Sequence, residues 1–118
     1  MSPAVERHGS FDALDADEPF PGVERRVVEA DGATVARYVF APGGAFPRHV
    51  HPQEQVTIVE AGEVELDVEG ERTTLGAGDW SVVPGGIAHG ITAGAAGAAI
   101  LAIVVPRRAS ADEYTLVE

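Results

Sequence analysis

The chain has no cysteine among its 118 residues, which excludes disulfide bonds, thiolate metal sites and a cysteine nucleophile. It also has no lysine, so all eight of its basic residues are arginine. Long apolar runs are absent too, because the longest, residues 95–105, is far shorter than the roughly 20 residues that a membrane-spanning helix needs. Residues 1–7 lack the apolar stretch of a secretory signal. These absences predict a cytoplasmic protein with no membrane partner.

Acidic residues greatly outnumber basic ones, at nineteen against eight, and the net charge is −11. Phosphate contacts need a basic face, so this balance excludes nucleic acid as a partner and disfavours anionic membrane surfaces. Together with the missing lysine, the charge favours a protein adapted to high salt, where the Debye length shrinks to roughly 3 Å at 1 M. The alternative is an ordinary acidic protein from a genome rich in alanine, glycine, valine and arginine codons.

Glycine and proline punctuate short segments that are rich in valine, threonine and isoleucine. Residues 27–28 and 34–40 read as two strands joined by a turn at residues 31–32, Asp-Gly. Residues 63–69 alternate acidic and apolar side chains, as a strand with one face on the core does. Turn signals about every 8–12 residues indicate an all-β sandwich or barrel. Further strands are expected at 55–60, 71–75, 80–83, 89–92, 98–105 and 114–117, with turns at 61–62, 76–79 and 93–97 and a helical turn at 110–113.

The length of the chain predicts one domain with a single core. Residues 1–22 are polar, acidic and without period, and we expect them to form an extended N-terminal arm or lid with a strand-like stretch near residues 11–14. Residues 23–118 carry the strand pattern and form the expected β-domain. Exposed barrel edges and the arm together predict a homodimer.

Three of the four histidines lie in two segments rich in glycine and proline. His49 and His51 are two residues apart, so an extended chain can present both side chains to one centre. Gln55 would lie roughly 13 Å beyond His51 on a straight strand, so the chain must turn at residues 52–54 for it to reach the same centre. Because of that turn, strand alternation cannot decide between Glu54 and Gln55 as the next ligand.

The two segments resemble the paired sequence motifs of the cupin superfamily. The first has the spacing of the first motif, at Gly43, His49, His51, Gln55 and Gly62. The second has the spacing of the second motif, at Gly78, Pro84, Gly86 and His89. The chain departs from the usual pattern twice, with glutamine at position 55 in place of glutamate and Ala93 in place of asparagine.

This resemblance implies an all-β cupin fold for residues 23–118, a jelly-roll barrel or double-stranded β-helix. It also implies one divalent transition metal near the barrel centre, held by His49, His51, Gln55 and His89. Three imidazoles and an amide suit zinc, nickel, manganese, iron and copper alike. Since all four ligands are neutral, the metal would keep its full charge and make a bound water or substrate more acidic.

The resemblance extends to dioxygenases of diketones and flavonols, to sugar isomerases, and to enzymes that linearise unsaturated sugar acids. We therefore expect a metal-dependent enzyme of isomerase, lyase or dioxygenase type, acting on a small oxygen-rich substrate such as a sugar acid or a dicarbonyl compound. Gln55 cannot act as a general base, so Glu54 is the candidate catalytic residue, unless it is simply a solvated carboxylate. The alternative function is a non-catalytic module that binds or senses a small molecule.

Other side chains near the motifs have candidate roles. Arg48 is a candidate to bind an anionic substrate, although on a regular strand it would point away from the metal and form a surface or interface ion pair. Phe46 is placed to line a pocket, while Tyr38, Phe40 and Trp80 are expected in the core.

Overall fold

The computed structural model describes residues 8–118, whose regular structure is almost entirely β-strand. A short 3-10 helix, η1 (Phe11–Ala13), comes first. The strands that follow are β1 (Asp17–Phe20), β2 (Val23–Glu29), β3 (Thr34–Phe40), β4 (Ala45–Val50), β5 (Glu54–Val68), β6 (Glu71–Gly76), β7 (Trp80–Val83), β8 (His89–Val105) and β9 (Thr115–Leu116). In this part of the chain no helix is both long enough and apolar enough to span a membrane. The predicted all-β class is confirmed.

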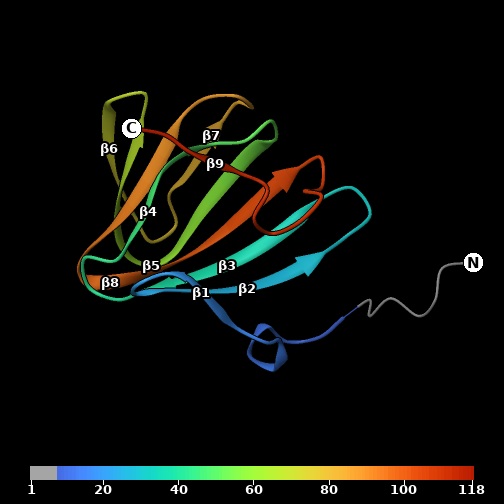
Figure 1. Cartoon of the computed structure of the whole chain (residues 1–118). Coiled ribbons are helices and arrows are strands. Elements are labelled where there is room, and N and C mark those ends of the chain that lie inside the picture. The colour runs from blue at the N-terminus through green and yellow to red at the C-terminus, as the bar shows by residue number, and fades with distance from the viewer. Residues whose placement is uncertain (1–7) are drawn as a thin grey trace, which may run out of the picture.

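Two long strands, β5 and β8, run antiparallel along most of their length and form the spine of the fold. The first half of β5 and the second half of β8 lie in one sheet with β1, β2, β3 and β7. Their other halves lie in a second sheet with β4, β6 and β9. The curled sheet encloses the core as a barrel (Figure 1). This is the jelly-roll architecture that the sequence predicted.

The turns predicted at residues 61–62 and 93–97 are wrong, because the chain continues there as the single strands β5 and β8. The register of their pairing shifts on either side of Gly62. Gly62 and Gly97 have φ angles of 72° and 75°, and a Cβ built on Gly62 would lie 2.1 Å from the Gly97 carbonyl oxygen. Bulges bend a strand and increase its twist. The glycines therefore bend the β5–β8 ribbon from one sheet into the other instead of ending its strands.

The hairpin predicted around residues 31–32 is confirmed, since β2 and β3 pair antiparallel along their full length. The strand-like stretch expected near residues 11–14 is wrong. That segment is the helix η1, where the Ser10 hydroxyl accepts a hydrogen bond from the Asp12 amide because serine competes for nearby backbone groups. The extended part of the predicted arm comes later, as β1, which pairs with β2. Residues 1–7 of the arm lie outside the described residues.

The C-terminal segment crosses back to the mouth of the barrel and pairs with β4 through β9 (Figure 1). Its expected helical turn at residues 110–113 is one isolated hydrogen-bonded turn, in which the Glu113 amide donates to the Ser110 carbonyl. The strand expected at residues 114–117 is confirmed by β9. The segment therefore lies beside β4, next to His49, which pairs with Leu116.

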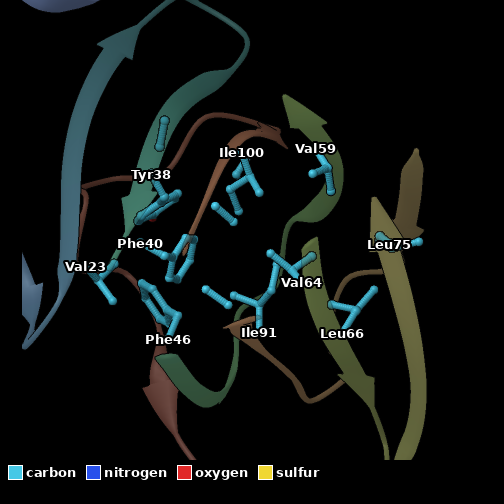
Figure 2. Close-up of a cluster of buried hydrophobic side chains, with 14 of the residues drawn as sticks. Val23, Tyr38, Phe40, Phe46, Val59, Val64, Leu66, Leu75, Ile91 and Ile100 are labelled. Atoms are coloured by element: carbon cyan, nitrogen blue, oxygen red, sulfur yellow. The ribbon is translucent and has the colours of Figure 1, made fainter. Parts of the chain in front are cut away.

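Aromatic and aliphatic side chains fill different parts of the core (Figure 2). Tyr38, Phe40 and Phe46 gather on one side, and the Tyr38 and Phe46 rings meet edge to face at 5.6 Å. The predicted core positions of Tyr38 and Phe40 are confirmed. The core position of Trp80 is wrong: its side chain is 67% exposed, because β7 turns Val83 inward and Trp80 outward.

Candidate metal centre

Three histidine side chains converge inside the barrel. His49 on β4 and His89 on β8 stand opposite each other in the pairing of these strands, and His51 follows the end of β4. Each is at most 4% exposed. Their ligand nitrogens all lie within 4.8 Å of one another, so the cluster can hold one metal ion. The structure thus brings together the three histidines that the motifs singled out.

Each imidazole is oriented by a hydrogen bond from its Nδ1 to a backbone carbonyl two residues away. The carbonyls belong to Pro47 for His49 at 2.8 Å, to Gln53 for His51 at 3.0 Å and to Ile87 for His89 at 2.9 Å. A carbonyl oxygen only accepts, so Nδ1 carries the proton and the Nε2 lone pair is free to bind a metal. The Nε2 of His89 is buried with no hydrogen-bond partner in residues 8–118. A metal ion would satisfy this orphaned nitrogen.

Gln55, and not Glu54, faces the histidines. The chain bends at residues 52–53, as the spacing predicted, so β5 begins with Glu54 exposed and Gln55 buried. The Gln55 amide nitrogen donates to the Thr57 hydroxyl at 3.0 Å, which turns its Oε1 toward His51. This alternation settles the direction of both side chains and leaves Glu54 on the outer surface.

The contact between Gln55 and His51 also fits a metal site. Gln55 Oε1 lies 3.0 Å from His51 Nε2. In the tautomer of His51 that carries its proton on Nδ1, both atoms present lone pairs, and two acceptors at this distance repel unless a cation lies between them. Two ligand atoms about 2.1 Å from one ion, at right angles, are about 3.0 Å apart. The donor set therefore suits a divalent ion.

Burial lowers the pKa of all three imidazoles. Desolvation is the largest cause in each case and lowers the pKa of His49 to about 3. The pKa values of His51 and His89 are lowered as well, and the positive charge of Arg108 contributes to all three shifts. Because the neutral imidazole is the form that binds metal, the cluster is ready for an ion at neutral pH.

A small cavity of about 20 Å³ lies beside the histidines, with room for one or two water-sized groups. Its polar lining residues are Tyr38, His49, Gln55, Thr57, His89 and Arg108. Phe46 also lines it, with its ring 4.5 Å from the His49 ring, which confirms the predicted role of this residue. Glu54 does not line the cavity, and none of the lining residues is a carboxylate.

Two residues near the site were not predicted from the sequence. Arg108 lines the cavity, and Tyr114 packs its ring 5.6 Å from His49 and 5.2 Å from Phe46. The pair Arg107-Arg108 after the central strand was a visible signal, but nothing local shows which arginine turns inward. Tyr114 reaches the site because the C-terminal segment folds back onto β4, whereas Arg108 is held by the hydrogen bond from its amide to the Thr34 hydroxyl on β3.

Arg48 precedes His49 on β4 and does not line the cavity, as a regular strand predicts, and its Nε is buried without a partner in residues 8–118. No carboxylate of the described chain lies within 4.0 Å of it, so the predicted ion pair is not formed on the surface of this chain, and an ion pair at an interface stays a prediction. The side chain is half-buried beside the close approach of Gly90 to β4.

Both a family model and many solved structures match this chain. The family model described as the cupin domain matches residues 36–105, more than half of the chain. No curated protein sequence matches the chain significantly. Many solved structures resemble it, and three of them illustrate the range.

An RmlC-like cupin from Shewanella frigidimarina has a TM-score of 0.82 at 24% identity, covering 89% of this chain and 95% of that one. KdgF from Halomonas sp. has a TM-score of 0.77 at 27% identity, covering 86% and 97%. The polyketide cyclase RemF from Streptomyces resistomycificus has a TM-score of 0.78 at 21% identity, covering 97% and 87%. At such identities the first and third show a common fold and nothing about activity.

Proposed function

The chain belongs to the cupin family, and from this premise we propose that it is a metal-dependent enzyme acting on a small oxygen-rich substrate. The observation that carries the proposal is the set of free imidazole nitrogens that converge inside the barrel. The orphaned Nε2 of His89 and the facing lone pairs of His51 and Gln55 support it. A buried arrangement of this kind is costly unless an ion satisfies it.

We propose His49, His51, Gln55 and His89 as the ligands of one divalent ion: zinc, nickel, manganese, iron or copper. A bound ion supplies Lewis-acid polarisation of a carbonyl, enol or carboxylate oxygen, or oxygen activation in the case of iron. Thr57 holds the Gln55 amide with its oxygen toward the ion. The rings of Phe46 and Tyr114 pack around His49 and keep bulk water away from it.

The cavity lining favours one kind of chemistry among those that the resemblance implied. With no carboxylate in the lining, the position of Glu54 gives no support to its proposed role as a base. Isomerase or lyase reactions must transfer a proton, and with no carboxylate in the lining a water acidified by the metal would be the base. A sugar acid is our preferred substrate class, with a dicarbonyl compound as the alternative.

A non-catalytic module that binds a small molecule is the second candidate. The cavity of about 20 Å³ favours it, because a space of this size holds an ion and a small group more readily than a whole sugar. The two candidates differ in turnover. An enzyme converts its substrate, whereas a binding module is stabilised by the same molecule without forming a product.

The proposal is tested by metal analysis of untagged protein that never contacts a nickel column, followed by product detection by NMR with an unsaturated sugar acid and a 1,3-diketone. We expect about one divalent ion per chain. The variants His49→Ala and His89→Ala should lose the ion and the turnover while staying folded. His8→Ala is the matched control, because His8 is exposed and outside the site. Protein that holds no metal and refuses added metal would overturn the proposal.

We also propose that the protein is a homodimer that associates through the outer face of its first sheet. Paired positions there form an apolar row with one residue from each of β2, β3, β8, β5 and β7: Val28, Val35, Ile103, Val56 and Val82. Val28 and Val82 are 40% and 47% exposed. A chain of charge −11 repels its copies, so a second copy fits best along this row, in which none of the five residues is charged. A cytoplasmic location and adaptation to high salt stay predictions.

A further inference from the structure

Arg108 is a buried cation without a carboxylate partner. The residue is 4% exposed, yet within residues 8–118 no carboxylate oxygen lies within 4.0 Å of its guanidinium. The other deeply buried arginine, Arg25, shows what is usual: it is 3% exposed and forms ion pairs with Asp17 and Asp112. Burying a charge is costly unless it is paired, so a direct anionic partner for the Arg108 guanidinium is missing from the described chain.

The side chain is held in place beside the metal ligands. The Arg108 amide donates to the Thr34 hydroxyl at 3.0 Å, and a terminal nitrogen of its guanidinium donates to the Ala111 carbonyl at 3.2 Å. Its Nε is buried with no hydrogen-bond partner in the described chain. The same side chain lines the cavity with His49 and Gln55. The planar fork of a guanidinium suits a carboxylate, which can accept two parallel hydrogen bonds from it.

We propose that Arg108 binds a carboxylate group of the substrate next to the metal, so that the substrate is an anion. The inference rests on the proposed function, because it places this anion at the same site. It separates the two substrate classes left open there: a sugar acid supplies the carboxylate, and a neutral dicarbonyl compound does not. The charge balance agrees, since the proposed metal ligands are neutral and no carboxylate lines the cavity.

The test compares acetate with acetamide, its neutral isostere, by calorimetric titration of the zinc-loaded protein. Both probes are far smaller than a sugar acid, and only acetate carries the charge. In Arg108→Gln we expect acetate affinity to fall about tenfold or more, because a charge-assisted hydrogen bond is lost, while acetamide affinity changes little. Arg107→Gln is the matched control: this neighbouring arginine is exposed and pairs with Glu29, so the same loss of charge should leave acetate binding unchanged.

A second variant covers the case in which Arg108→Gln fails to fold. Arg108→Lys keeps the charge but lacks the planar fork, and we expect it to bind acetate severalfold more weakly than the wild type. Acetate binding that is equal in the wild type and in the folded Arg108 variants would overturn the inference. So would a loss of the same size in Arg107→Gln, or tighter binding of inorganic phosphate than of acetate by the wild type.

Metal content, measured on every preparation, separates this inference from the proposed function. If the zinc-loaded wild type and the zinc-loaded Arg108 variants bind acetate equally well, only the role of Arg108 is refuted. Protein that cannot be loaded refutes the metal site, and the same comparison then runs on the metal-free protein. In the metal-free protein, weaker acetate binding by the Arg108 variants than by the wild type would support the role of Arg108, and equal binding would refute it.

Discussion

At the scale of single residues, Gln55 is what sets the candidate metal centre apart. It stands where the cupin motif usually has glutamate, and it points its amide oxygen at His51 under the control of Thr57. A neutral ligand leaves the charge of an ion uncompensated, which acidifies what the ion binds but weakens its hold on the protein. The presence of glutamine at position 55 in place of glutamate also explains why no carboxylate lines the cavity.

Gln55→Glu should therefore tighten metal binding, on the order of tenfold, because an anionic oxygen replaces a neutral one at the ion. Competition with a chelating indicator measures this affinity. Glu54→Gln is the matched control, since it removes a charge one residue away on the outer face of β5 and should leave the affinity unchanged. Metal binding that is weaker in Gln55→Glu would show that Oε1 is not a ligand.

The metal-free protein should lose stability as the solution is acidified from neutral pH. Folding lowers the pKa of His49 from 6.5 to about 3 and also lowers the pKa values of His51 and His89. Between the folded and unfolded pKa values the unfolded chain binds more protons, so the free energy of unfolding falls as the pH drops. Its full value is present above about pH 7, beyond the unfolded pKa near 6.5.

Denaturant titrations between about pH 7.5 and pH 5.5 check this dependence above the range in which most carboxylates titrate. His49→Gln should flatten the profile, because it removes the imidazole with the largest shift. His8→Ala should leave the profile as it is, since His8 is exposed. A wild-type profile that is flat over this window would contradict the buried, neutral state of the cluster.

At the scale of elements, the bent β5–β8 ribbon places the site. Both β5 and β8 take part in two sheets. The bend in these strands places His89, at the start of β8 in the second sheet, opposite His49. The bend depends on the approach of Gly62 to Gly97 at positive φ angles. Glycine is needed there for both its conformation and its lack of a side chain.

Gly62→Ala should destabilise the protein by about 3 kcal/mol or more, because the new Cβ would lie 2.1 Å from the Gly97 carbonyl oxygen at a φ of 72°. Thermal and denaturant unfolding measure the loss. Gly32→Ala is the control, as a Cβ at Gly32 meets nothing within 4 Å in the β2–β3 turn. Similar stability for the two variants would mean that the ribbon bends without this contact.

At the scale of the whole molecule, a strongly acidic surface is interrupted by an apolar stripe. The row from Val28 to Val82 crosses the outer face of the first sheet, with Trp80 exposed beside it on β7. Apolar patches of this kind on an otherwise charged protein mark contact surfaces. This is the physical basis for the proposed homodimer.

Val82→Glu should convert the dimer to monomer, because it places a carboxylate in the apolar row on both copies. Size-exclusion chromatography with light scattering measures the mass. Leu116→Glu, which adds the same charge at a 52% exposed position on β9, should stay dimeric. A wild-type monomer at micromolar concentrations, or dissociation caused by Leu116→Glu and not by Val82→Glu, would refute the proposed interface.

Most of the strands could be predicted from the sequence, because alternation and turn residues are local signals. The β2–β3 hairpin follows from Asp31-Gly32, and the outward carboxylates of residues 63–69 follow from their period of two. The same local signals failed at Gly62 and Gly97, since a glycine that ends a strand and a glycine that bends it look alike until the partner strand is known. The predicted core position of Trp80 failed for a similar reason, because the sequence alone does not distinguish an exposed apolar residue on a strand from a core residue.

The sequence by itself determined the all-β class and the histidines of the candidate site, because strand alternation and motif spacing place His49, His51 and His89 without reference to distant contacts. Only the tertiary structure decided that Gln55 faces inward and Glu54 outward, since this depends on where the chain bends before β5 begins. Only the tertiary structure brought Arg108 to the cavity and Tyr114 against His49, because Arg108 is anchored to Thr34 on β3 and β9 pairs with β4, each more than sixty positions earlier in the chain. Local interactions select the strands and the ligands, whereas contacts between residues far apart in sequence decide which side chains complete the site.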